Sequence, residues 1–150
     1  MKRTRKIEIG FTESLNRLPF IEIKFEGVKE PKLALIDTGS EITILDEDMM
    51  HRIDRNFITT SEAGTISIDG FSGSSERSKQ VLFTTTICVK DVNGEEWKHG
   101  IRGVLMDFSS VKEPLNAACP SADVVAIIGS DTLHEMKAQL DYKKQKVIFK

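Results

Sequence analysis

Two unbroken apolar runs limit most strongly what this chain can fold into. The first is Leu33–Ile36 and the second is Val124–Ile128, and neither alternates with polar residues. A strand without polar alternation is typical of a strand covered on both faces. The first run ends at Asp37 in a turn-forming cluster, and the second ends at Gly129. We therefore expect two buried strands at the centre of a single domain, residues 1–150.

Most of the remaining segments favour strands. Pro19–Phe25 alternates apolar and polar residues, as a half-buried strand does, and Thr65–Ile68 repeats the pattern. The pair Asn93-Gly94 is preferred in a two-residue type I′ turn, which predicts a hairpin with arms 84–91 and 96–105. Further strands are expected at 7–9, 42–45, 80–89, 139–142 and 146–149. The fold class indicated is all-β.

Two short helices complete the predicted elements. One or two helical turns are expected over Asp46–Ile53, because acidic residues at a helix start are favourable. A second helix is expected up to Lys137, with Ser130 and Asp131 as its capping residues. The segment 107–123, which holds two prolines, is interpreted as a long loop or insertion.

Composition and charge exclude several classes of protein. The chain has 39% hydrophobic and 29% charged residues and a net charge of −2, which is ordinary for a globular domain. This charge provides no basic field for nucleic acid, and no stretch approaches the ~18 apolar residues of a membrane span. Cys88 and Cys119 are too few for a disulfide framework and are interpreted as buried thiols. No apolar signal core follows the basic N-terminus, so we expect a cytoplasmic location unless a leader has been removed.

Motifs for metal and nucleotide chemistry are missing from the sequence. His51, His99 and His134 form no metal-binding spacing, and the chain contains no phosphate-binding glycine loop followed by lysine. The sequence therefore implies no metal and no organic cofactor.

The tetrapeptide Asp37-Thr38-Gly39-Ser40 is the one motif with specific chemistry. It places a carboxylate at the end of a strand buried on both faces. Gly39 permits a tight reversal that brings main-chain N–H groups near this carboxylate, and the Thr38 and Ser40 hydroxyls can fix the backbone and the carboxylate itself. The alternative is a purely structural role, in which the motif is an Asx-type turn that only ends the strand.

The order of segments around this motif resembles the retroviral-type (retropepsin-like) aspartic proteases. The resemblance covers most of residues 18–150 through the series A-L-I-D-T-G-S, I-T-I-L, a glycine-rich hairpin, V-V-A-I-I-G-S-D-T-L and L-D-Y-K-K-Q-K-V-I-F. It implies a retropepsin-like acid-protease β-barrel with one short C-terminal helix, Ser130–Lys137, and a flap hairpin.

The resemblance also implies a role for individual residues. Asp37 would be catalytic, and Thr38, Gly39 and Ser40 would support it together with Ile128 and Gly129, which would lie under the catalytic loop. The flap over a bound polypeptide would comprise Asp69, Gly70, Phe71, Ser72 and Gly73, with Phe71 either covering the substrate or packing on its own domain. Asp69 and Ser72 depart from the more apolar and glycine-rich retroviral flap.

The number of motifs in the chain bears on the oligomeric state. Aspartic proteolysis needs two carboxylates that share one proton, because like charges at that distance cannot both ionise. Only Asp37 is followed by Thr-Gly, and no other aspartate is followed by Thr-Gly or Ser-Gly. An active enzyme is therefore expected to be a homodimer that brings two copies of Asp37 together and hydrolyses a polypeptide substrate, without nucleic-acid or membrane partners.

Other interpretations stay open at this stage. A retropepsin-fold module could dimerise or bind peptides without cleaving them, and an unrelated β-barrel could hold a small ligand. Within the protease hypothesis, a Ser40 hydroxyl that donates to ionised Asp37 would lower the apparent pKa of the carboxylate pair, so Ser40→Ala is predicted to raise the pH optimum. The C-terminal strands could join a dimer sheet or pair within one chain.

Overall fold

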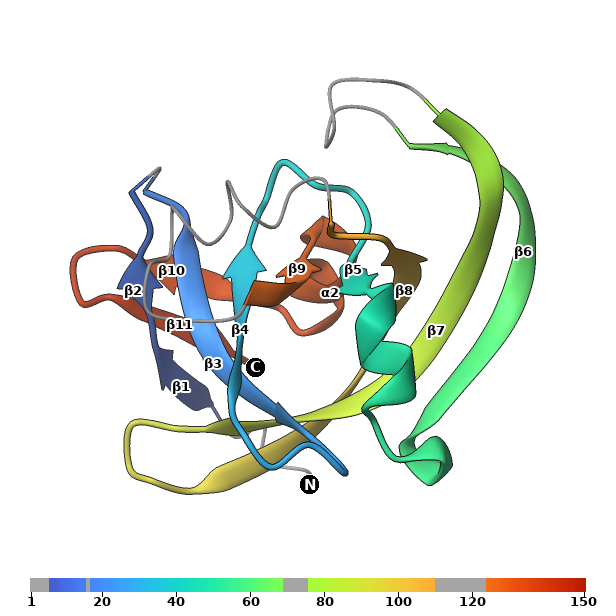
Figure 1. Cartoon of the computed structure of the whole chain (residues 1–150). Coiled ribbons are helices and arrows are strands. Elements are labelled where there is room, and N and C mark those ends of the chain that lie inside the picture. Colours follow the sequence, from blue (N-terminus) through green and yellow to red (C-terminus); the bar gives the residue numbers. More distant parts are fainter. Residues whose placement is uncertain (1–5, 16, 69–75, 110–123) are drawn as a thin grey trace, which may run out of the picture.

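The computed structural model describes residues 6–15, 17–68, 76–109 and 124–150. Within these residues the chain is mostly β, with short helices between strands (Figure 1). The strands are β1 (Ile7–Gly10), β2 (Thr12–Glu13), β3 (Pro19–Phe25), β4 (Lys32–Ile36), β5 (Ile44–Asp46), β6 (Ile58–Ile68), β7 (Glu76–Lys90), β8 (Glu96–Met106), β9 (Val124–Ile128), β10 (Gln139–Asp141) and β11 (Lys146–Phe149). The helices are the 3-10 turns η1 (Glu47–His51) and η2 (Arg55–Phe57) and the α-helix α2 (Ser130–Glu135).

The larger sheet closes on itself to form a barrel. Its strand order is β2-β3-β4-β9-β5-β8-β7-β6, and an additional pairing joins β3 to β7. Lys24 and Phe25 of β3 pair with Cys88 and Ile87 of β7. This contact closes a ring of β3, β4, β9, β5, β8 and β7, while β2 and β6 lie outside the ring.

Strand β9 separates two strands that follow each other in the sequence. It pairs in parallel with β4, with Ile36 opposite Ile128, and antiparallel with β5, with Ile44 opposite Ile127. The connection from β4 to β5 therefore passes over the end of β9, which comes from the far end of the chain (Figure 1).

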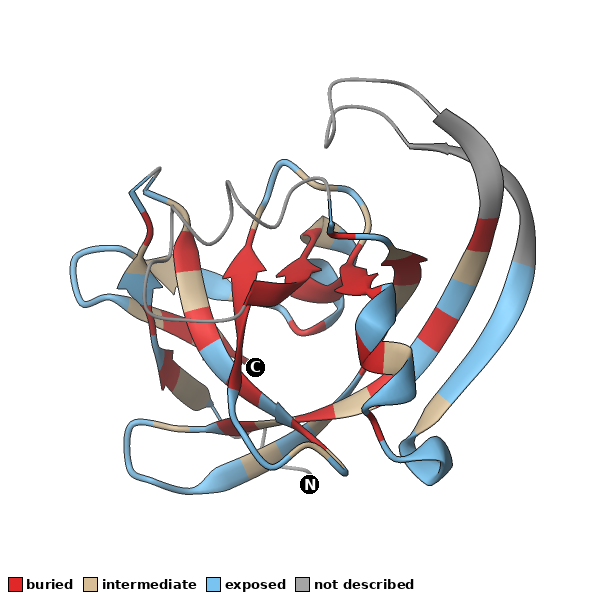
Figure 2. Cartoon of the chain, in the orientation of Figure 1, coloured by how far each residue is buried: buried red, intermediate tan, exposed pale blue. Residues whose placement is uncertain are grey.

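Burial on both faces explains the two unbroken apolar runs. Every residue of β4, β5 and β9 is buried, as Figure 2 shows in the middle of the view. Ala34 and Ile36 pack in the larger apolar cluster, whereas Leu33 and Leu35 pack in a second cluster on the other face. The prediction of strands covered on both sides is confirmed for 33–36 and 124–128.

The smaller sheet joins the two ends of the described chain. Its order is β1-β11-β10, and Ile9 of β1 lies opposite Val147 of β11. The C-terminal strands thus pair within one chain, which was one of the two arrangements left open by the sequence. Lys146 of β11 forms an ion pair with Glu8 of β1, with 3.7 Å between Nζ and Oε2, while its neighbour Val147 is fully buried.

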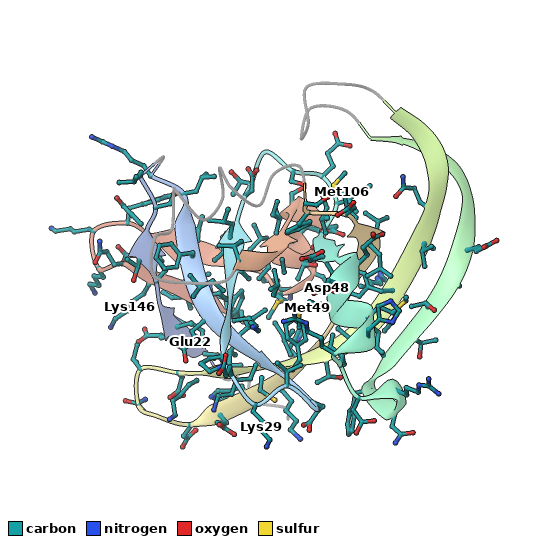
Figure 3. The ribbon with its side chains drawn as sticks, viewed as in Figure 1. Glu22, Lys29, Asp48, Met49, Met106 and Lys146 are labelled. Atoms are coloured by element: carbon teal, nitrogen blue, oxygen red, sulfur yellow. The ribbon has the colours of Figure 1, made fainter. Side chains whose placement is uncertain are left out.

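Helices η1 and α2 lie where the sequence predicted helical turns but differ in detail, and η2 was not predicted. Asp46 caps η1 by accepting a hydrogen bond from the Asp48 N–H, and Met49 beneath it is buried (Figure 3). Helix α2 ends at Glu135, not at Lys137, and its N-cap is Gly129 rather than Ser130 or Asp131. The cap prediction is wrong because the Asp131 carboxylate accepts the Thr132 N–H and the Thr43 hydroxyl instead of closing the first turn.

Several strand boundaries differ from the sequence-based predictions, for example that of β7, which begins at Glu76 where 80 was predicted. Strand β6 begins at Ile58, well before 65, and β5 begins at Ile44, because residues up to Thr43 belong to the loop after Asp37. The hairpin between β7 and β8 pairs Lys90 with Glu96, so its loop is longer than the predicted two-residue turn.

The longer loop has a local cause. A type I′ turn needs positive φ at both central residues, and in this loop only Gly94 has it, at φ 84. The Asp91 carboxylate accepts hydrogen bonds from the N–H groups of Asn93 and Glu95, both at 2.9 Å. These bonds hold the wider loop and exclude the predicted turn.

Candidate active site

Asp37 lies at the end of β4, where the barrel strand gives way to a tight loop. Its backbone N–H donates to the Ile128 carbonyl at 3.0 Å, which extends the β4–β9 pairing by one residue. The Gly39 N–H donates to Asp37 Oδ1 at 2.9 Å. The side chain is half-buried, and among the described residues nothing donates a hydrogen bond to its other oxygen, Oδ2. One carboxylate oxygen is therefore fixed by the loop and the other is available for a second group.

The loop is closed by bonds to its own backbone and to the start of α2. The Ser40 N–H donates to the Asp37 carbonyl at 3.1 Å, and the Ser130 N–H donates to the Ser40 carbonyl at 2.7 Å. Asp37 and Ser40 are thus both tied to the segment that follows β9. The predicted position of Ile128 and Gly129 under this loop agrees with these contacts.

Position 129 requires glycine because a side chain has no room there, and not because of its backbone angles. Its φ of −90 and ψ of 179 are open to any residue. A Cβ atom at this position would lie 2.6 Å from the Ile42 carbonyl oxygen and 2.8 Å from the Ser40 carbonyl oxygen. The loop after Asp37 therefore packs directly on the Gly129 backbone.

The two hydroxyls of the motif do not contact the Asp37 carboxylate. The Ser40 hydroxyl donates to the Ile42 carbonyl at 2.8 Å, and Thr38 is exposed. A hydroxyl has one proton, so Ser40 cannot also donate to Asp37. The structure therefore contradicts the Ser40–Asp37 bond on which the predicted rise in pH optimum for Ser40→Ala was based.

The flap residues predicted from the sequence, 69–73, lie outside the described residues. The strands on either side are described, and Ile68 of β6 pairs with Glu76 of β7. The far ends of β6 and β7 rise on the same side of the barrel as the β4–β5 loop (Figure 1). The segment 110–123 also lies outside the described part of the chain.

Thr43 and Asp131 contact the site, and the sequence-based hypothesis gave neither of them a role in it. Thr43 is fully buried, and its hydroxyl accepts the Gly129 N–H at 3.2 Å and donates to Asp131 Oδ1 at 2.7 Å. The sequence carried no signal for these contacts, because a threonine in the alternating segment I-T-I-L is typical of a residue that faces water.

Two cavities are described in the structure, and Asp37 lines neither of them. A cavity of about 500 Å³ is lined mainly by acidic residues, among them Asp46 and Asp107. Cys88 lines a second cavity of about 220 Å³ and is partly buried, not fully buried as the sequence predicted; this partial burial raises the pKa of its thiol. Within the described ranges there is no cluster of three His, Cys, Asp or Glu side chains that could hold a metal ion, and no helix long and apolar enough to span a membrane.

Comparisons with known proteins find similar solved structures but no similar sequence. No protein-family model and no curated protein sequence matches the chain. Among solved structures, it is similar to basic 7S globulin from soybean, with a TM-score of 0.62 and 7% identity over 98% of this chain and 50% of that chain. A retropepsin-like aspartic protease from Rickettsia conorii is 17% identical, with a TM-score of 0.49 over 97% of this chain and 89% of that chain. The structure titled edgp has a TM-score of 0.57 at 9% identity, over 99% of this chain and 46% of that chain.

These similarities bear on the fold alone, because every identity is far below 25%. The chain spans about half the length of the soybean structure, 50% of it, and most of the Rickettsia one, 89%. The predicted all-β class is confirmed: the described chain is a mostly β, closed barrel with one short helix near its C-terminus, and its fold is similar to those of basic 7S globulin and edgp.

Proposed function

We propose that this chain is one subunit of a homodimeric aspartic endopeptidase, with Asp37 as its catalytic residue. The observation that carries the proposal is the state of the Asp37 carboxylate: half-buried, with Oδ1 held by the Gly39 N–H at 2.9 Å and Oδ2 without a donor among the described residues. Asp37 differs from a carboxylate that only forms a turn, such as exposed Asp54, because it is half-buried at the end of a strand that is covered on both faces. The retropepsin-like fold and the single Asp-Thr-Gly motif support the same proposal.

The chemistry requires a second carboxylate, and the chain has a single Asp-Thr-Gly motif. Within the described part of one chain, no hydrogen bond joins Asp37 to another carboxyl group. In the proposed dimer, Asp37 of one copy is ionised and takes a proton from water as the water oxygen attacks the peptide carbonyl carbon. Asp37 of the other copy is protonated and donates to the carbonyl oxygen. The Asp37 that took the water proton then gives it to the amine nitrogen as the C–N bond breaks, and the proton on the former carbonyl oxygen returns to the other Asp37, which leaves a carboxylic acid and a free amine.

The first test compares peptide cleavage by the wild type, Asp37→Asn and Asp54→Asn from acid to neutral pH. Asp54 is a matched control, because it is exposed and its Oδ1 accepts the Asn56 N–H at 2.9 Å in the same kind of turn. We expect cleavage of an unbiased peptide library by the wild type and Asp54→Asn, and none by Asp37→Asn. A folded wild-type dimer that cleaves nothing would refute the enzyme and favour a peptide-binding or dimerisation module.

A mixing experiment tests the shared pair of carboxylates. Wild type and Asp37→Asn are mixed in varying ratios, allowed to exchange subunits, and assayed. If each active site needs Asp37 from both copies, activity follows the square of the wild-type fraction, so an equal mixture retains about one quarter. Activity that follows the fraction itself, about one half, would show that each copy works alone.

A further inference from the structure

We infer that Thr43, with Asp131 as its hydrogen-bond acceptor, is a positioning residue for the Asp37 loop. Thr43 lies just before β5, and Asp131 lies in the first turn of α2, so the two residues come from opposite ends of the chain. The activity measurement below rests on the proposed function. The hydrogen-exchange measurement depends only on the backbone contacts and needs no activity.

The Thr43 side chain has its full set of hydrogen bonds. Its hydroxyl donates its one proton to Asp131 Oδ1 at 2.7 Å and accepts the Gly129 N–H at 3.2 Å. The Thr132 hydroxyl lies 2.6 Å away, and because the Thr43 proton is already used, Thr132 is the donor in that contact. One donated and two accepted bonds fill the capacity of a hydroxyl group, which accounts for a threonine with no exposed surface.

The Thr43 backbone is held just as closely. Its carbonyl oxygen accepts the Val104 N–H at 3.0 Å, and Gly103 packs against the same carbonyl with no room for a side chain. Thr43 is therefore fixed to β8 through its backbone and to the β9–α2 junction through its side chain. Such a residue transmits the position of one element to the other.

The Thr43 bond lies between the two bonds that hold the Asp37 loop. It engages the N–H of Gly129; the preceding residue, Ile128, accepts the Asp37 N–H at 3.0 Å, and the following residue, Ser130, donates to the Ser40 carbonyl at 2.7 Å. A shift of the Gly129 backbone would lengthen both outer bonds. Displacing a catalytic group by about 1 Å can cost ~100-fold in rate.

Asp131 acts through its acceptor oxygen. Oδ1 receives both the Thr43 hydroxyl and the Thr132 N–H, each at 2.7 Å. An asparagine oxygen accepts the same two bonds, whereas alanine accepts neither. Asp131→Asn is thus expected to preserve the arrangement and Asp131→Ala to lose it.

The experiment compares Thr43→Val with Thr43→Ser and with a matched control, Thr85→Val. Thr85 is also a buried threonine whose hydroxyl donates to a backbone carbonyl, that of Phe57, and it makes none of the contacts to the Asp37 loop. We expect Thr43→Val to lower kcat about 10- to 100-fold with KM little changed, and Thr43→Ser to restore it. Thr85→Val should leave kcat near the wild-type value.

Amide hydrogen exchange reports the same inference without cleavage. In Thr43→Val the Asp37 and Ser130 amides should exchange at least about 10-fold faster, while strand amides such as Val89 stay unchanged. Unchanged exchange at Asp37 and Ser130 would overturn the inference, as would equal kcat losses in Thr43→Val and Thr85→Val. If the wild type cleaves nothing, the proposed function fails and the exchange result alone decides the inference. If Thr43→Val does not fold, the pair Asp131→Ala and Asp131→Asn is measured in its place, and equal exchange in both would overturn the inference.

Discussion

The contact between Gly129 and the Asp37 loop leads to a quantitative prediction for Gly129→Ala. The added methyl carbon would lie 2.6 Å from the Ile42 carbonyl oxygen, 2.7 Å from the Ile42 carbonyl carbon and 2.8 Å from the Ser40 carbonyl oxygen. All three are backbone atoms, so no flexible side chain can move aside. Since the backbone angles of Gly129 suit any residue, the effect comes from overpacking and not from backbone strain.

The magnitude follows from two contributions. Overpacking a well-packed site costs about 1–3 kcal/mol. Moving the loop away also weakens the Ser130 bond to the Ser40 carbonyl, now 2.7 Å, and the Gly129 bond to Thr43, now 3.2 Å. Each such bond contributes about 0.5–1.5 kcal/mol. We therefore expect Gly129→Ala to lower the free energy of unfolding by about 2–6 kcal/mol, which is large against the ~5–15 kcal/mol of a typical domain.

Urea unfolding measures this change, with Gly10→Ala as the matched control. Gly10 is exposed in β1, has an ordinary backbone, and has nothing within 4 Å of the added methyl carbon. We expect Gly10→Ala to lie within about 0.5–1 kcal/mol of the wild type. For Gly129→Ala, the urea midpoint should fall by about 1–3 M at an unchanged slope of about 2 kcal/mol/M. Equal midpoints for the two variants would refute the steric argument.

Two further predictions concern titrating groups. The N–H of Ser109, at 2.9 Å, and its hydroxyl hold the pKa of Asp107 below its usual value, so this stabilisation is complete above the unfolded pKa and is lost as pH falls through the folded pKa. Ser109→Ala should raise the Asp107 midpoint in an NMR titration, and an unmoved midpoint would contradict this cause. Partial burial raises the pKa of Cys88. In a Cys119→Ser background, alkylation of Cys88 should therefore reach half its maximal rate above about pH 8.5, the pKa of a free thiol. A midpoint below this pH would contradict burial as the cause.

The strands near the site could be predicted because their patterns are local. The segments 19–25, 32–36 and 124–128 coincide with β3, β4 and β9. In each, the side-chain pattern reflects whether one face or both faces are buried, and that information lies within a few consecutive residues. The position of Asp37 at the end of a buried strand follows from the same pattern.

The hydrogen bonds of the polar residues could not be predicted in this way. From the sequence alone, the Ser40 hydroxyl could donate to the nearby Asp37 carboxylate or to the nearby Ile42 carbonyl. In the structure it donates to the Ile42 carbonyl. In the hairpin after β7, the Asp91 carboxylate competes with the turn preference of Asn93-Gly94 and prevails. In both cases the outcome depends on side-chain geometry that composition does not encode.

Thr43 illustrates a limit that is not local. In the segment I-T-I-L it occupies the polar position of an alternating strand, a pattern typical of a residue facing water. It is nevertheless fully buried, because its partners Gly129, Asp131 and Thr132 come from the last quarter of the chain. No window of neighbouring residues contains this information.

The topology makes the Asp37 site a property of the complete barrel. Strand β9 lies between β4 and β5, so the two strands that carry the loop do not pair with each other. Without β9, the Asp37 N–H and the Ser40 carbonyl would lose their partners at Ile128 and Ser130. Leaving such groups unpaired at the edge of a core costs about 1–3 kcal/mol each. The carboxylate therefore reaches its held geometry only when the second apolar run is in place, which couples the fixed orientation of Asp37 to the folding of the whole chain.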